Sequence, residues 1–176
     1  MPTISDVSTA RSGVSTAPIE HVSIPTGLSY GVLVSAFERE LGRWDPATGS
    51  RLVERRAPWS DVEREVERVG RAHGLMIFFN IDQGVVTSLS GKAKRCSLYL
   101  VGNPVIANQI LDIDPSGSFL VPFRVGLYDA GDAGGAVIAY DRPSSFLGVL
   151  GRPGLKKIGA LLDQKIEAVV AALCKA

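Results

Sequence analysis

An almost unbroken run of apolar residues, Leu75 to Ile81, is the feature that most restricts the fold of this chain. The run directly follows Gly74 and is interrupted only by Asn80, a pattern typical of a strand that is buried on both faces of a sheet. It is far shorter than the roughly 20 residues that a helix needs to cross a membrane. It therefore predicts a central strand of a sheet and no membrane-spanning segment.

Four other segments have strand-like patterns. In residues 119–128, every second position from Phe119 to Leu127 carries Phe, Val or Leu, the alternation of a strand. A Gly- and Asp-rich stretch, 129–135, then leads into a further apolar segment, which predicts a hairpin. Pro122 has no amide hydrogen for a neighbouring strand, so the first strand of this hairpin is predicted to be an edge strand or to be bulged there. The four predicted strands cover residues 20–24, 97–101, 119–128 and 136–140.

Helical spacing of apolar residues recurs between these strands. Ser60 and Glu63 have the spacing of a capping box, which predicts a helix start, and Gly74 suits the left-handed residue that ends this helix. Asn103 and Pro104 similarly suit the N-cap and first position of a short helix. The predicted helices cover residues 28–41, 60–73, 105–111 and a C-terminal segment that begins after Gly154 and reaches residue 173.

The order of these elements indicates an α+β fold. Strands and helices neither alternate strictly nor separate fully, so we expect a two-layer sandwich with a largely antiparallel β-sheet and helices packed on one face. Residues 1–19, rich in Ser, Thr and Ala, are expected to form a disordered tail. Residues 20–176 then form a single domain, in which 42–59 is a flexible insertion, either a loop or a short helix between two longer helices.

Composition excludes several classes of function. A formal net charge of +1 provides no strong field for nucleic acid or an anionic membrane. The two cysteines, Cys96 and Cys174, are far apart and have no CxxC or His neighbour, so we expect reduced thiols and a cytoplasmic protein. With two histidines and no metal-binding spacing, neither a metal site nor another cofactor is expected.

Three segments together resemble the family called domain of unknown function 302. They are the strand and turn Tyr99–Pro104, the proline-containing Leu120–Val125, and Ala139–Pro143 after the glycine-rich turn. The helix before Gly74 and the strand that ends at Ile81-Asp82 are also similar to that family. The resemblance covers roughly residues 20 to 173, and its most specific part is Gly-Asn-Pro followed by the proline-containing strand.

This resemblance implies a small α+β domain, often dimeric, with no established activity and therefore no catalytic residue to assign. The unusually apolar strands also favour a homodimer. Two features depart from the family pattern, the long 42–59 connection and Gln83, which stands where many members have His. A role that depends on an Asp–His pair after this strand is therefore not expected.

Polar residues at three predicted strand ends are the candidate ligand-binding residues. They are Asp82, Gly102, Asn103, Tyr140, Asp141 and Arg142. A helix N-terminus at Asn103 can present free amides to an anion, and the carboxylate, phenol and guanidinium groups can orient a polar ligand. We expect the groups around Asp82, Asn103 and Tyr140 to converge on one pocket.

Each candidate also has a purely structural interpretation. Asp82 suits a turn or cap, Asn103 a capped helix start, and Tyr140 an inward-facing side chain beside a local ion pair. Cys96 follows the basic residues Lys92, Lys94 and Arg95, which can activate a thiol, but a buried strand cysteine is the simpler interpretation.

Two functions are compatible with this sequence. The first is a non-enzymatic module that binds a small molecule or a partner protein, without nucleic acid or membrane. The alternative is an enzyme of small-molecule metabolism in which Asp82 is a general base and an anionic group is held near Asn103 or Arg142. The enzyme predicts that Asp82 lies in a dry cleft, and an exposed Asp82 bonded only to its own turn would argue against it.

Overall fold

A six-stranded sheet forms the centre of the molecule. The computed structural model describes residues 16–131 and 134–175, so the predicted tail falls largely outside the described residues. The strand order is β1-β6-β5-β4-β3-β2, and all neighbours are antiparallel except β2 and β3. The strands are β1 (His21–Pro25), β2 (Gly42–Arg43), β3 (Met76–Asp82), β4 (Cys96–Gly102), β5 (Phe123–Asp129) and β6 (Ala136–Asp141).

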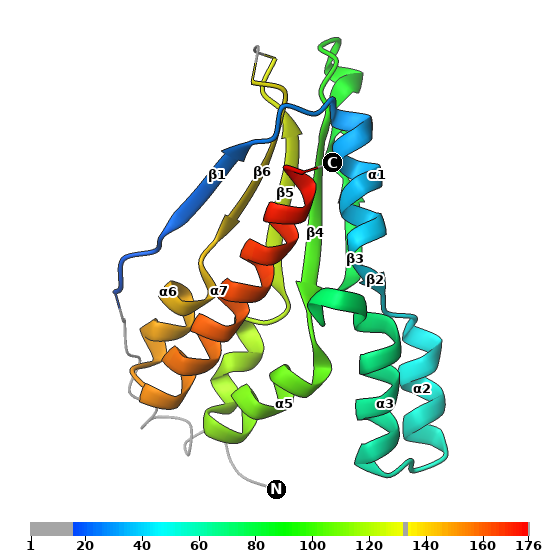
Figure 1. Cartoon of the computed structure of the whole chain (residues 1–176), viewed down its shortest axis with the longest axis vertical. Helices are drawn as coiled ribbons and strands as arrows, with labels where there is room; N and C mark the ends of the chain where they lie inside the picture. The colour runs from blue at the N-terminus through cyan, green and yellow to red at the C-terminus, as the bar shows by residue number, and fades with distance from the viewer. Residues whose placement is uncertain (1–15, 132–133, 176) are drawn as a thin grey trace, which may run out of the picture.

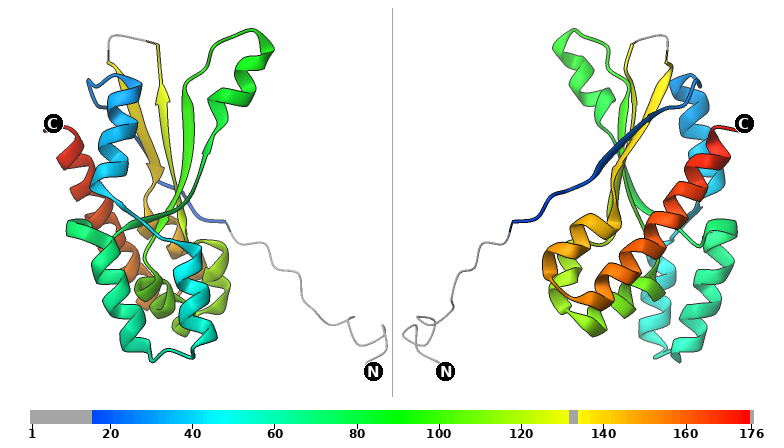
Figure 2. Two further views of the ribbon diagram at one scale, coloured as in Figure 1. Left: turned by 90° about the vertical axis from the view of Figure 1, so that its right-hand side faces the viewer. Right: turned by 60° about the vertical axis from the view of Figure 1, so that its left-hand side comes forward.

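Helices α1 and α7 lie on the same face of this sheet (Figures 1 and 2). Helices α2 and α3 form an arm beside the lower end of the sheet in Figure 1, and α4 stands at its upper end. The α-helices are α1 (Tyr30–Glu40), α2 (Pro46–Glu54), α3 (Trp59–Gly70), α4 (Gln83–Thr87), α5 (Pro104–Ile113), α6 (Pro143–Leu147) and α7 (Pro153–Leu173). Short 3₁₀ turns are η2 (Arg71–His73), η3 (Ser88–Ser90), η4 (Pro115–Phe119) and η5 (Gly148–Leu150).

The hydrophobic core lies between the sheet and helices α1 and α7. Alternate residues of β4, β5 and β6 point into it because side chains along a strand face opposite sides in turn. The buried Phe37 and Tyr99 rings meet edge to face with centroids 5.0 Å apart. The predicted architecture, an α+β sandwich with a largely antiparallel sheet and helices on one face, is therefore confirmed.

The opposite face of the sheet exposes apolar side chains. Phe79 and Ile81 of β3 are 54% and 44% exposed. Their partners on the neighbouring strand β4 are the half-buried Leu100 and Leu98. At the upper end of this face, α4 and η3 carry three more exposed apolar residues, Val85, Val86 and Leu89. We call the strand residues Phe79, Ile81, Leu98 and Leu100 the open sheet face.

Strand β3 differs from the prediction of a central strand buried on both sides. It lies next to the edge strand β2, and its register with β4 shifts between Ile77 and Phe79. Only the first part of β3 is fully buried, because the part beyond this irregularity extends past β2 and the helices. The second half of β3 is therefore apolar without being buried on both faces.

The strand predicted at residues 119–128 is shorter, and its position in the sheet was predicted wrongly. Strand β5 begins at Phe123, after the cis peptide between Val121 and Pro122, and it lies inside the sheet between β4 and β6. Pro122 precedes the strand, so its missing amide hydrogen interrupts no pairing. Residues 115–119 form η4 instead.

The helix after the 42–59 connection also starts differently. Helix α3 begins at Trp59 with Pro58 as N-cap and has no side-chain capping bond, so the predicted capping box at Ser60 does not form. The connection itself contains the short helix allowed by the sequence, α2, and the two-residue strand β2. None of the described helices is long and apolar enough to span a bilayer.

Candidate functional site

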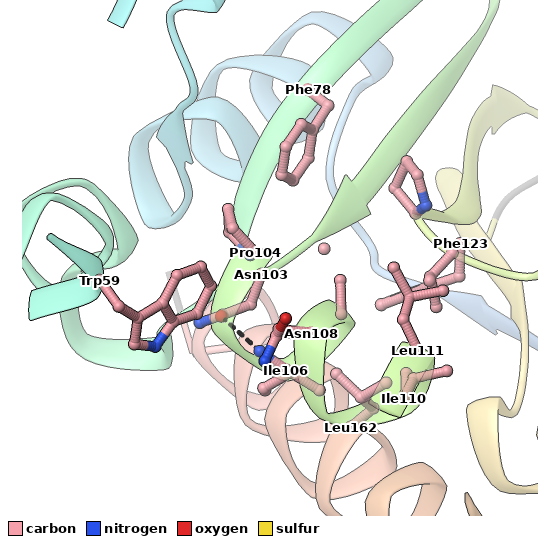
Figure 3. A pocket seen from close by; sticks show the side chains of 14 residues that line it. Trp59, Phe78, Asn103, Pro104, Ile106, Asn108, Ile110, Leu111, Phe123 and Leu162 are labelled. Carbon is pink, nitrogen blue, oxygen red and sulfur yellow. Dashed lines mark hydrogen bonds between the residues drawn. The ribbon is translucent and has the colours of Figure 1, made fainter. Parts of the chain in front are cut away.

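A largely apolar cavity of about 390 Å³ lies at the lower end of β4 and is the candidate functional site (Figure 3). It is formed where α5, the start of α3, the start of β5 and Phe78 of β3 come together. Fourteen residues line it: Trp59, Phe78, Gly102, Asn103, Pro104, Ile106, Ala107, Asn108, Ile110, Leu111, Val121, Pro122, Phe123 and Leu162. A cavity of this size accommodates a small organic molecule.

Asn103 holds the helical wall of the cavity in place. Its Oδ1 accepts hydrogen bonds from the amides of Val105 and Ile106, at 2.8 and 3.0 Å, and the second of these is drawn in Figure 3. Its Nδ2 donates to the carbonyl of Gly74 at 2.8 Å. Asn103 is therefore the predicted helix cap, and it also ties α5 to the turn before β3.

Gly102 gives the adjacent wall its close packing. A Cβ atom at this position would lie 3.3 Å from Pro122 Cβ and 3.5 Å from Phe78 Cε2, so a side chain would crowd the two residues that border the cavity here. Gly102 and Asn103 are the two candidate binding residues that line this cavity. Their contribution is the shape of its wall.

Aromatic side chains form three sides of the cavity. In Figure 3, Trp59 and Phe123 lie at opposite sides, with Phe78 above and the residues of α5 below. Trp59 is 44% exposed and Phe123 is buried, so Trp59 lies at the open side of the cavity. These residues were not singled out from the sequence, because each also fits an ordinary core or surface position.

Asn108 is the polar side chain at the rim that remains able to accept a hydrogen bond. Its Nδ2 donates to Asp112 Oδ2 at 3.0 Å, which orients the amide and leaves Oδ1 as an acceptor. Among the described residues, none that lines the cavity has a titratable side chain. The cavity is therefore suited to an uncharged molecule, since an unpaired charge would lose its hydration there.

The predicted convergence of Asp82, Asn103 and Tyr140 on one pocket does not occur. Asp82 pairs with Ser97 at the start of β4, whereas Asn103 follows its end, so the two lie roughly 20 Å apart along the sheet. Asp82 is exposed, and its Oδ1 accepts a hydrogen bond from the Val85 amide at 3.1 Å. It caps α4, and this geometry argues against a general base in a dry cleft.

Tyr140, Asp141 and Arg142 are also separate from the cavity. Tyr140 is buried on the helix face of β6, and desolvation together with the nearby Glu167 raises the pKa of its phenol. Arg142 precedes α6 and pairs with Glu20 at 3.3 Å and Glu167 at 2.7 Å. Both residues therefore take the structural roles that the sequence had left open as alternatives.

Asp141 points to the other face of the sheet, where a second hollow of about 530 Å³ lies. Asp141 Oδ1 is 2.8 Å from His21 Nδ1, and its Oδ2 is 3.9 Å from an Arg124 nitrogen. The hollow is also lined by Leu100, Phe119 and Pro122. The segment 121–123 borders both hollows, so it forms a common wall between them.

Cys96 lies apart from both hollows at the other end of β4. It is a partly buried free thiol, and Cys174 is an exposed one. Of the basic residues before Cys96, Lys94 donates to the Thr87 carbonyl and Arg95 pairs with Asp129. Within residues 16–131 and 134–175, no group of three or more His, Cys, Asp or Glu side chains is arranged to hold a metal ion.

Comparison with known proteins identifies the family. The model of the family described as Domain of unknown function DUF302 matches residues 52–173, more than half of the chain. The chain belongs to the DUF302 family. The residues that suggested this resemblance, including Gly102-Asn103-Pro104 and Pro122, lie within the matched DUF302 region. All fourteen residues that line the cavity lie in the matched region, whereas residues 42–51 precede it.

A solved DUF302 structure supports the same fold. The crystal structure of an uncharacterized conserved protein DUF302 from Bacillus stearothermophilus superposes with a TM-score of 0.61 and 14% sequence identity. The similarity covers 86% of this chain and 96% of that one. At this identity the likeness establishes the fold alone. None of the curated proteins matches the chain.

Proposed function

We propose that this DUF302 domain is a non-enzymatic module that reversibly binds a small, uncharged, mostly apolar molecule in the cavity beside α5. The observation that carries the proposal is the lining, which is apolar apart from two asparagines and the Trp59 indole N–H. Transfer of apolar surface from water into such a site is favourable without any charge pairing.

The side chains at the cavity favour binding over catalysis. General acid–base catalysis most often uses a titratable side chain within hydrogen-bond reach of the reacting group, and the described lining residues include none. The amide oxygen of Asn103 is already engaged by two backbone amides, and its nitrogen by the Gly74 carbonyl. Asn108 can orient a ligand through one hydrogen bond, which adds specificity to apolar burial.

Native mass spectrometry of freshly purified protein, followed by a thermal-shift screen of small uncharged compounds, tests this function. A ligand that binds only the folded state must raise the melting temperature. Ala107→Phe, which projects a ring from α5 into the cavity, should abolish the shift. Gln109→Phe places the same ring outside the cavity lining and should retain it. Equal shifts for both variants, or no shift with any compound, would refute the proposal.

We also propose that two copies associate through the open sheet face. The open sheet face belongs to one side of five strands, β1 and β3 to β6, which at a spacing of about 4.8 Å and about six residues each span on the order of 500 Å² in projection. Side-chain relief and the exposed Val85, Val86 and Leu89 add to this area, which approaches the roughly 800 Å² per partner of a stable interface. The family resemblance, which implies dimers, supports the same proposal.

Light scattering distinguishes a dimer from a monomer of 18.7 kDa. We expect twice this mass at micromolar concentration for the wild-type chain and for Val53→Glu, which alters an exposed residue of α2. Phe79→Glu on the open sheet face should give the monomer mass, because a dimer would have to bury the new carboxylate. A wild-type monomer would refute this proposal and leave the ligand proposal intact.

The expected location is the cytoplasm, where free thiols such as Cys96 and Cys174 stay reduced. Cell fractionation with an antibody to the chain tests this expectation. Recovery of the protein in a secreted or periplasmic fraction would contradict it.

A further inference from the structure

We propose that the cavity selects planar aromatic molecules, and that the 42–59 connection provides this selectivity by holding one aromatic wall in place. This inference rests on the proposed binding function and adds the class of ligand. Three of the fourteen lining residues, Trp59, Phe78 and Phe123, are aromatic, about three times the 7% share of aromatic residues in the whole chain.

The arrangement of these rings favours a flat ligand. Trp59 and Phe123 border the cavity from opposite sides, and Phe78 closes it above α5 (Figure 3). Pro104 and Pro122 add two further rigid rings to the lining. Aromatic pairs gain stability from offset or edge-to-face arrangements beyond the effect of buried area, whereas a saturated ring of the same size gains only from burial.

Trp44 packs against Phe78 without itself lining the cavity. Its ring centroid lies 6.1 Å from that of Phe78, with 32° between the two planes. The Trp44 amide donates to the Ile77 carbonyl at 2.9 Å, and the ring packs over Gly49, where an added Cβ would lie 3.5 Å from Trp44 Nε1. Trp44 is thus fixed between α2 and β3, and it acts as a positioning residue for Phe78.

The described lining residues include no carboxylate, which argues against a quaternary ammonium cation as the ligand. Rings also bind quaternary ammonium groups, but such a cation would enter a cavity whose described lining residues include no carboxylate to balance its charge. Desolvation of an unpaired charge is more costly than a ring contact can compensate. The geometry therefore favours a neutral ring system over an aromatic cage for cations.

The first test compares two ligands with the same carbon skeleton, aromatic 1-naphthol and saturated decahydro-1-naphthol, by calorimetry with the wild-type chain and with Asn108→Ala. Both ligands carry one hydroxyl that can donate to Asn108. The second chain removes this hydroxyl bond to Asn108, in which the phenol is the stronger donor. We expect 1-naphthol to bind about three- to tenfold more tightly to both chains. Equal affinities would overturn this inference while leaving the proposed function intact. Binding of neither compound would overturn both.

The second test concerns Trp44. Trp44→Ala should weaken 1-naphthol binding about threefold or more and leave decahydro-1-naphthol unchanged, whereas Trp44→Phe, which keeps a ring behind Phe78, should bind both as the wild type does. Thermal unfolding verifies that each variant is folded. Because the chain has two tryptophans, Trp44→Phe also leaves Trp59 as the only indole, and its fluorescence should change with 1-naphthol. An equal loss for both ligands in Trp44→Ala would show a general structural role and refute the assignment.

Discussion

Asn103 shows how one side chain can account for a motif that suggests a binding site. It bonds to two amides of α5 and to the Gly74 carbonyl, which is 29 residues away in the sequence. An anion at this helix start would have to displace these bonds. The Gly-Asn-Pro segment therefore shapes the cavity wall, and the neighbouring side chains are the ones that the proposed ligand would contact.

Replacement of Asn103 by Ala should destabilise the folded state by about 1–3 kcal/mol, because both the helix cap and the bond to Gly74 are lost. Urea denaturation measures this change. Asn108→Ala removes an exposed amide on the same helix, and we expect a change within about 0.5 kcal/mol. A similar cost for the two variants would contradict the role assigned to Asn103.

Asp114 gives the fold a pH dependence. The hydroxyl and amide of Ser116 donate to its Oδ1 at 2.7 and 3.0 Å, and Arg152 donates to Oδ2, so the pKa of this carboxyl lies below its usual value. A lowered pKa in the folded state means that the ionised carboxylate stabilises the fold. This contribution is present above the pKa of the unfolded chain and disappears as the pH falls through the lower pKa of the folded chain.

Asp114→Asn should therefore melt at a lower temperature than the wild type at pH 7, and the difference should close below about pH 4. Calorimetric melting curves across this pH range measure it. Glu63→Gln, at an exposed position of α3, serves as the control and should show no comparable gap at pH 7. A gap for Asp114→Asn that widened on acidification would contradict the sign.

At the scale of elements, the packing of α6 against α7 depends on one glycine. A Cβ on Gly159 would lie 2.5 Å from Ser144 Cα. The buried Asp163, one turn further along α7, accepts a hydrogen bond from the Ser144 amide at 3.1 Å. The absence of a side chain at 159 thus lets α7 approach close enough to cap the short helix.

Gly159→Ala should cost about 1–3 kcal/mol, because the two helices must separate to admit the methyl group. Gly148→Ala provides a matched control, since its Cβ would meet nothing within 4 Å and its φ of −60° suits alanine. We expect that change to be neutral or slightly stabilising. Chemical denaturation of both variants tests the contact, and equal stability would refute it.

Elements with strong local signals could be predicted from sequence. Gly74 is left-handed as predicted, although it follows η2 and α3 itself ends at Gly70. Asn103 caps α5, and α7 starts at Pro153, two residues before the predicted start. Prediction failed where the structure depends on contacts between distant segments or on a feature too short to leave a pattern. Alternation before Phe123 does not reveal that the chain turns at Pro122, and a two-residue strand such as β2 has no periodicity to detect.

At the scale of the whole molecule, Asp82 lies away from the other candidate residues because neighbouring strands are antiparallel, whereas Tyr140 is separated from Asn103 by the intervening strand β5. The C-terminal ends of β3 and β4 therefore lie at opposite ends of the sheet along the strand direction, with Asp82 at one and Asn103 at the other. Residues at the C-terminal ends of two adjacent strands meet only when the strands are parallel. The aromatic residues of the actual cavity come from separate segments, α3, β3 and β5, and no local pattern joins them.

Local stability should differ sharply between the arm and the sheet. Helix α2 buries no residue fully, whereas β4 and β5 lie inside the sheet and carry fully buried side chains such as Tyr99 and Leu127. Amides of α2 should therefore exchange with solvent about a hundredfold or more faster than those of β4 and β5. Native-state hydrogen exchange with mass spectrometry measures this ratio, and comparable protection would contradict it.

The common wall at residues 121–123 has a consequence for measurements of affinity. One of its sides borders the ligand cavity and the other borders the hollow near the open sheet face. If a ligand shifts this wall, it alters the surface offered to a second copy, and reciprocity requires that association of two copies alter ligand affinity by the same factor. The dissociation constant of the ligand would then vary with the concentration of the protein itself.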